Sequence, residues 1–89
     1  MLEERNIRIT NKLGLHVRPA AQLAELANKY QSQIAINIDK RSVNAKSIIE
    51  LLTLGATEGT MLTFRAEGED AAAALDSIQQ LIENKFDEE

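Results

Sequence analysis

The chain has 89 residues, of which 44% are hydrophobic, and a formal net charge of −4. This length favours one domain with one core, so we expect a single domain over residues 1–89. The lack of cysteine excludes disulfides, thiolate nucleophiles and cysteine-built zinc sites, and it fits a cytoplasmic protein. The acidic balance and the absence of Trp argue against nucleic acid as a partner. The N-terminus has no apolar stretch, so we expect neither a signal peptide nor a membrane anchor.

The first half of the chain combines a strand, a helix and a hairpin. Apolar and polar residues alternate around Ile7, which predicts a strand within residues 5–10. An apolar stripe at helical spacing then predicts a helix over roughly residues 17–29. Alternating isoleucines and a polar turn before Val43 predict two strands joined as a hairpin within residues 34–43.

A second, shorter helix follows the hairpin. Ser47 and Glu50 have the spacing of a capping box, in which each side chain satisfies a free donor at a helix start. We expect this helix to end at Gly55. Alternation over residues 62–66 predicts a fourth strand, and the segment 68–70 then supplies a turn and an N-cap.

The last helix has the clearest pattern in the chain. An apolar stripe runs from Ala71 to Ile82 with polar residues opposite, and we expect the tail at residues 87–89 to fray. The order of elements is therefore βαββαβα. Short strands linked by hairpins do not suit a doubly wound parallel sheet, so we predict an α+β fold with an antiparallel sheet covered on one face by helices.

His16 is the only histidine, so imidazole chemistry has a single position in this chain. Pro19 is tolerated in the first turn of a helix, which places His16 at or near the N-cap. The free amides of Val17 and Arg18 then lie close by, and the Arg18 guanidinium suits phosphate oxygens. Imidazole is partly unprotonated near neutral pH, and its phosphoryl adduct is labile. The pattern predicts a phosphoryl carrier, with Gly14 shaping the loop that exposes the ring.

Other interpretations of His16 explain less. A lone histidine is often an ordinary surface or capping residue. A metal site would lack ligands, because the chain has no second His and no Cys. Self-contained catalysis would need a base–nucleophile pair that the sequence does not offer. We therefore expect no metal, no cofactor and no enzyme activity of its own, but a carrier that needs a partner enzyme.

Two segments resemble the signatures of a known family. Residues 11–21, NKLGLHVRPAA, are similar to the active-site signature of the HPr phosphocarriers of the bacterial phosphoenolpyruvate-dependent phosphotransferase system. Residues 44–48, NAKSI, with Leu54 and Gly55 resemble the family's second, serine-containing signature. The resemblance runs nearly end to end and implies an HPr-like open-faced β-sandwich, with three helices on a four-stranded antiparallel sheet.

The resemblance also implies a reaction and its partners. His16 would accept a phosphoryl group through Nδ1 from enzyme I and donate it to sugar-specific IIA proteins or domains, while Arg18 steadies the group. Ser47 matches a regulatory position that an HPr kinase/phosphorylase modifies in many members, although its capping box already explains its presence.

A partner-binding patch beside the histidine is implied as well. Leu51 and Leu54 can share the buried face of the second helix, so we expect at least two of its other aliphatic side chains to be exposed. The expected patch consists of Val17, Ala21, Ile48, Ile49, Leu52, Thr53 and Gly55.

One departure concerns the choice of partners. The positions of Glu25, Asn28 and Glu50 are often lysine in enteric members, where they form a basic rim. The nitrogen-related branch uses a relative with the same histidine motif, but some of that branch lack Pro19, which favours sugar uptake. The alternatives are that branch, or a regulatory binding module controlled through Ser47. A module that never transfers phosphate would not need the histidine. We expect a monomer.

Overall fold

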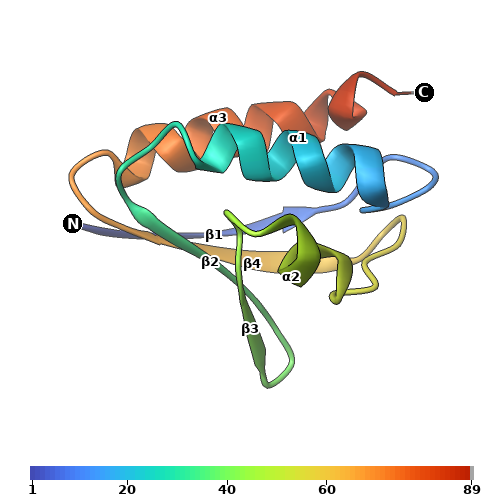
Figure 1. Ribbon diagram of the computed structural model, residues 1–89, viewed down its shortest axis with the longest axis horizontal. Helices are drawn as coiled ribbons and strands as arrows, with labels where there is room; N and C mark the ends of the chain where they lie inside the picture. The colour runs from blue at the N-terminus through green and yellow to red at the C-terminus, as the bar shows by residue number, and fades with distance from the viewer. Residues whose placement is uncertain (89) are drawn as a thin grey trace.

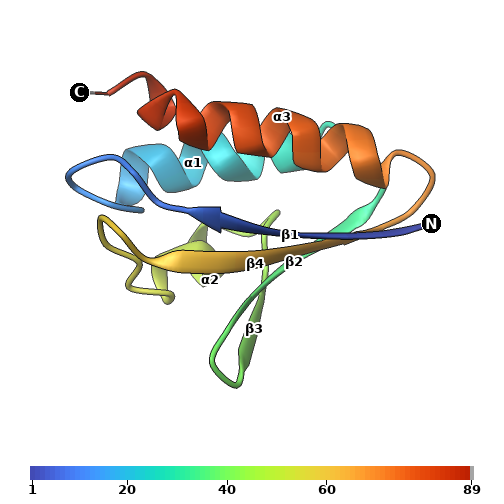
Figure 2. The ribbon, with the colours of Figure 1, turned by 180° about the vertical axis from the view of Figure 1, so that it is seen from behind.

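The computed structural model describes residues 1–88, in which two long helices cover one face of a four-stranded sheet (Figure 1 and Figure 2). A short third helix lies beside the first. The elements in chain order are β1 (Leu2–Arg8), α1 (Val17–Ala27), β2 (Gln33–Ile38), β3 (Arg41–Asn44), α2 (Ile48–Leu52), β4 (Met61–Glu67), α3 (Ala71–Glu83) and a 3₁₀ turn, η1 (Lys85–Asp87).

The sheet has the strand order β1-β4-β2-β3, and every neighbouring pair is antiparallel. The register sets Ile7 opposite Leu62 and Ile36 opposite Phe64, so alternate side chains of three strands gather on one face. That face packs against α1 and α3 to form the core. The largest fully buried side chains are Phe64, Phe86, Ile9, Leu23, Ile36, Leu51, Leu62, Leu75, Ile78 and Ile82.

The predicted α+β class, the order of elements and the antiparallel sheet are confirmed. The limits of several elements differ by one or more residues, most clearly at the first strand and the second helix. The first strand covers Leu2–Arg8 rather than residues 5–10, because its pairing with β4 extends back to Leu2 opposite Glu67. The last helical residue of α2 is Leu52, and Thr53 caps the helix before Gly55 is reached. Within the described residues, no helix has the length and apolar character needed to cross a membrane.

The segment 68–70 supplies the N-cap of α3, as predicted. Asp70 occupies the N-cap position, but its carboxylate makes no cap hydrogen bond. It accepts hydrogen bonds instead from the backbone N–H groups of Gln31 and Ser32, at 2.9 and 3.0 Å, and from the Ser32 hydroxyl. Asp70 therefore joins the start of α3 to the loop that follows α1.

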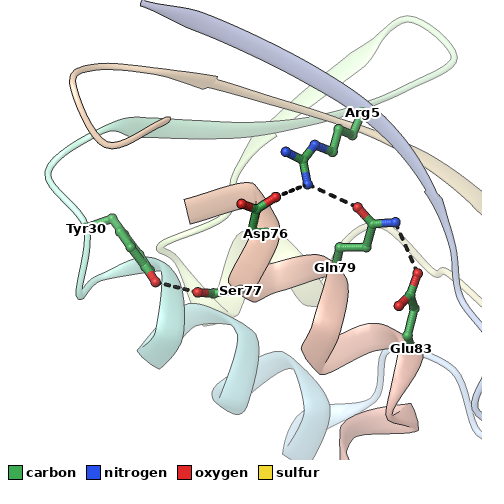
Figure 3. Close-up of polar contacts among 6 residues, drawn as sticks. All are labelled: Arg5, Tyr30, Asp76, Ser77, Gln79 and Glu83. Carbon is green, nitrogen blue, oxygen red and sulfur yellow. Dashed lines mark hydrogen bonds and ion pairs between the residues drawn. The ribbon is translucent and has the colours of Figure 1, made fainter. Parts of the chain in front are cut away.

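Polar side chains also join α3 to β1 and to the segment that follows α1 (Figure 3). Arg5 Nη1 lies 2.6 Å from Asp76 Oδ1 and donates to Gln79 Oε1 at 3.1 Å. The Tyr30 and Ser77 hydroxyls are hydrogen-bonded. At the other end of the helix, Thr10 Oγ1 donates to the carbonyl of Ile82 at 3.1 Å. This last contact brings the end of α3 beside the loop that leads into α1.

Candidate functional site

The loop before α1 is held in a conformation that few residues could adopt. Asn11 is fully buried, and its Nδ2 donates to the carbonyl of Gly14 at 2.8 Å. Gly14 has a φ of +70°, and a Cβ built there would lie 2.4 Å from the carbonyl oxygen of Ala56. The same oxygen accepts a hydrogen bond from Leu15 N at 2.9 Å. The close backbone contact therefore requires glycine and fixes the loop just before His16.

His16 is the N-cap of α1, as the position of Pro19 predicts. Its backbone is extended, and its carbonyl accepts from Ala20 N at 2.9 Å. Its side chain makes no cap hydrogen bond. Pro19 has no N–H, so the donors at this helix start that lack an intrahelical partner are the amides of Val17 and Arg18. Such amides, with the positive end of the helix dipole, favour an anion.

Glu88 lies against the His16 ring, so the prediction that the tail frays is wrong for this residue. Glu88 Oε2 is 2.9 Å from His16 Nε2, and Glu88 Oε1 accepts from Asn11 Nδ2 at 3.0 Å. The side chain of Glu88 is 18% exposed and that of His16 is 35% exposed. Glu89, the last residue of the predicted fraying tail, lies outside the described residues.

The Glu88 carboxylate is stabilised in its charged form. The hydrogen bond from Asn11 is the main cause that holds the pKa of this carboxyl below its ordinary value. The hydrogen bond and charge of His16 and the charge of Arg18 act in the same direction, against the opposing effect of partial burial. Glu88 is therefore ionised at neutral pH.

The structure brings several of the predicted residues around one groove. His16, Val17, Arg18 and Ala21 line it from α1, and Ile48 lines it from α2. The groove is also lined by Gln22, Ala24, Glu25, Asn28 and Lys46. Arg18 is exposed, and among residues 1–88 no side chain pairs with its guanidinium. A charge-assisted contact to a bound anion therefore remains open to it.

The apolar side chains of α2 divide as expected. Leu51 is fully buried and Leu54 is 7% exposed. Ile48, Ile49 and Leu52 are 42%, 77% and 39% exposed. Thr53 and Gly55 are exposed as well, although only Ile48 of this group reaches the groove beside His16. The predicted patch therefore lies on the surface, and its role in partner binding stays a prediction.

Ser47 caps α2, but the predicted capping box is only half formed. Ser47 Oγ accepts from Glu50 N at 3.2 Å. Glu50 does not return the contact to Ser47, because Ser47 N donates to the carbonyl of Asn44. Glu50 Oε1 accepts instead from Asn44 N at 2.8 Å. Ser47 is half-buried, and its hydroxyl already accepts the cap hydrogen bond of α2.

The contact with Glu88 is the part of this site that sequence reasoning missed. The buried aromatic Phe86 was the available signal, since an apolar residue beyond the stripe of α3 indicates that the tail packs against the domain. The described residues contain no group of three or more His, Cys, Asp or Glu side chains that could hold a metal ion.

Comparison with known proteins gives consistent results. Residues 3–84 match the family described as PTS HPr component phosphorylation site. The chain is 41% identical over 86 residues to a phosphocarrier protein HPr of Xylella fastidiosa, with 97% of each chain covered. It is 44% identical over 85 residues to a phosphocarrier protein NPr of Shewanella violacea, covering 96% of this chain and 93% of that one.

Solved structures agree with these relatives. A crystal structure of HPr from Thermoanaerobacter tengcongensis matches with a TM-score of 0.94 and 45% identity, covering 98% of each chain. A dimer of HPr from the same organism matches with a TM-score of 0.78, covering 92% of this chain and 94% of that one.

Proposed function

The chain belongs to the HPr family of phosphocarrier proteins of the phosphotransferase system, and we propose that it carries the phosphoryl group on His16. A family member of this kind is a carrier and not a catalyst. The observation that carries the proposal is the uncapped start of α1, where the half-exposed imidazole lies beside the amides of Val17 and Arg18.

The proposed step is a transfer between two nitrogen atoms. The lone pair of one His16 ring nitrogen forms an N–P bond, while the N–P bond of the phosphorylated donor breaks and its electron pair returns to the donor nitrogen. Negative charge on the transferring oxygens would be met by the amides of Val17 and Arg18 and by the Arg18 guanidinium. The same contacts serve the reverse geometry, in which an acceptor takes the group away.

We propose that enzyme I is the donor and that IIA proteins or domains are the acceptors. The test is incubation with enzyme I and phosphoenolpyruvate, followed by measurement of intact mass. The chain should gain one phosphoryl group that is lost in acid, as expected for a phosphoramidate, and His16→Ala should gain none. Phosphorylation of the His16→Ala variant by enzyme I would remove His16 from the reaction.

The exposed side chains Ile48, Ile49 and Leu52 are proposed to form the docking surface, with Val17, Ala21, Thr53 and Gly55 around them. A carrier needs one small apolar surface that several partners can bind and leave quickly. Ile49→Glu should therefore slow both transfer from enzyme I and transfer to the IIA acceptor, with little change in stability. Leu2→Glu is the matched control, because Leu2 is also exposed but lies in β1 and does not line the groove. Equal transfer rates in the two variants would contradict the proposed surface.

We propose sugar uptake, rather than the nitrogen-related branch, as the setting of the relay. Pro19 favours this setting, because some members of the nitrogen-related branch lack it. Sequence identity does not separate the two branches, since it is 41% to an HPr and 44% to an NPr. The phosphorylated chain should transfer faster to a sugar-specific IIA protein than to the IIA protein of the nitrogen-related branch. The opposite order of initial rates would assign the chain to that branch.

Ser47 is proposed as a second, regulatory phosphorylation position for an HPr kinase/phosphorylase. A phosphate there would bring negative charge to the edge of the exposed patch of α2. Ser47→Asp should weaken partner binding while the fold remains, because aspartate is a good N-cap and suits the positive helix end. Unfolding of this variant would instead give Ser47 a mainly structural role.

We also propose that the chain acts as a cytoplasmic monomer. Sedimentation at micromolar concentration should give the mass of one chain. A dimer under these conditions would contradict this part of the proposal.

A further inference from the structure

The contact between Glu88 and His16 assigns unequal roles to the two ring nitrogens. A neutral imidazole has one N–H and one lone pair, and a carboxylate can only accept a hydrogen bond. Because Glu88 Oε2 is 2.9 Å from Nε2, the favourable arrangement places the proton on Nε2. Nδ1 then carries the lone pair, and by the covalent structure of histidine it is the ring nitrogen nearer to the backbone of His16.

We propose that Glu88 is a positioning residue that holds the proton on Nε2 of His16 and so selects Nδ1 as the nitrogen that takes the phosphoryl group. The inference rests on the proposed function of His16. It adds a physical cause for the choice of nitrogen, located in the tail that follows α3 rather than in the motif around the histidine.

The tail that carries Glu88 is held in an unusual backbone conformation. Lys85, Phe86 and Asp87 have φ values of 56°, 55° and 60°, in the left-handed region that L residues with side chains avoid. Such a run persists only where other contacts fix it. Phe86 is fully buried in the core, and Glu88 N donates to the carbonyl of Lys85 at 2.8 Å.

Asn11 fixes the carboxylate itself. Its Nδ2 donates both to Glu88 Oε1 and to the carbonyl of Gly14, so one buried amide group joins the tail to the loop that precedes His16. The carboxylate cannot turn away from the ring without losing this contact. The relation of Glu88 to His16 resembles that of the carboxylate that orients a catalytic histidine in other active sites.

The proposed arrangement requires no proton movement during transfer. Nδ1 donates its lone pair to phosphorus while Nε2 keeps its hydrogen, so the ring gains a positive charge as the N–P bond forms. The leaving nitrogen of the donor takes back its bonding pair. The Glu88 carboxylate faces the charge that develops on the ring and stabilises it.

Chemical phosphorylation with phosphoramidate tests the choice of nitrogen without any partner protein. The ratio of the Nδ1 and Nε2 adducts is read by ³¹P NMR. The unmodified chain should give mainly the Nδ1 adduct, whereas Glu88→Gln should give the Nε2 adduct in at least equal amount. Asp87→Asn is the matched control, since it removes a neighbouring exposed carboxylate and tolerates the left-handed conformation. It should retain the ratio of the unmodified chain.

An unchanged adduct ratio in Glu88→Gln would overturn the proposal. In the enzymatic reaction, Glu88→Gln should slow transfer from enzyme I by about threefold to tenfold, the low end for a charge-assisted hydrogen bond because the pair is partly exposed. Faster transfer from enzyme I to Glu88→Gln would show that the tail blocks access to the His16 ring, which contradicts the positioning role. If enzyme I fails to phosphorylate the chain while the chemical ratio changes as expected, the proposed function fails and the role of Glu88 stands.

Discussion

The free amide groups at the starts of α1 and α2 differ in whether the N-cap side chain accepts a hydrogen bond from them. At α2 the N-cap Ser47 accepts from Glu50 N, so the side chain satisfies a donor of the first turn. At α1 the N-cap His16 makes no such bond and turns its ring toward Glu88 instead. A helix start that is satisfied by its own cap stabilises the fold, and one that is left open can receive an anion. This difference separates a structural helix start from the proposed phosphoryl site.

The largest effect is expected at Gly14, which shapes the approach to the open helix start. Gly14→Ala places a Cβ against the backbone at Ala56 and Thr57 and adds the strain of a positive φ. We expect a loss of about 3 to 4 kcal/mol in the free energy of unfolding, from overpacking and left-handed strain together. Urea unfolding measures it.

Gly55→Ala is the control for this variant. Gly55 also has a positive φ, of +61°, but a Cβ there would meet nothing within 4 Å. It should cost only about 1 kcal/mol from backbone strain. Equal losses at Gly14 and Gly55 would show that the contact with Ala56 does not fix the loop.

Arg18→Ala tests the open helix start through the reaction rather than through stability. The fold should persist, but transfer from enzyme I should slow by roughly 30- to 1000-fold, equivalent to about 2 to 4 kcal/mol for a lost transition-state contact. Arg65→Ala, in an exposed arginine of β4, should transfer at the normal rate. An unchanged rate in the Arg18 variant would remove Arg18 from the mechanism.

The two N-caps should also differ in their contribution to stability. Ser47→Ala removes a cap hydrogen bond and should lower the free energy of unfolding by about 1 kcal/mol. His16→Ala removes no cap, and its pair with Glu88 is partly exposed, so its loss should be smaller. Thermal unfolding of both variants measures this, and a larger loss for His16→Ala would reverse the comparison.

The smallest effect is expected at Asp70, at the start of α3, where the contribution to stability depends on pH. Hydrogen bonds from the Ser32 side chain, first, and from the Gln31 backbone hold the pKa of Asp70 below its ordinary value of 3.8. As the pH falls, Asp70 is therefore protonated in the unfolded chain before it is protonated in the folded one. The stabilisation from the Asp70 carboxylate is present above pH 3.8 and is lost as the pH falls through the lower pKa of the folded state. Asp70→Asn should flatten the decrease in stability over this acid range. A variant with the same acid dependence would show that Asp70 is not stabilised as described.

The sequence predicts most of this site because the decisive residues are close together in the chain. Pro19 locates the helix start, which puts His16, Val17 and Arg18 at its N-terminus whatever the rest of the fold does. The spacing of Ser47 and Glu50 likewise predicts a cap that the structure contains.

The parts that could not be predicted depend on contacts between distant segments. Asp70 fits the pattern of an N-cap, but tertiary packing brings the Gln31–Ser32 backbone within its reach. Glu88 contacts His16 only because a left-handed turn at residues 85–87 follows α3. Phe86 indicates that the tail packs against the domain, but the neighbouring polar residues give no sign of such a turn. Local patterns determine the elements, whereas these two carboxylates are placed by the assembled fold.

The most direct test of the difference between the two helix starts is to record ¹H–¹⁵N NMR spectra of the chain before and after phosphorylation. If the open start of α1 receives the phosphoryl group, the amide signals of Val17 and Arg18 should move strongly downfield, because these N–H groups gain charged acceptors. The Glu50 amide, already bonded to Ser47, should stay in place. Unchanged Val17 and Arg18 signals in a fully phosphorylated sample would contradict the assignment of α1 as the phosphoryl site.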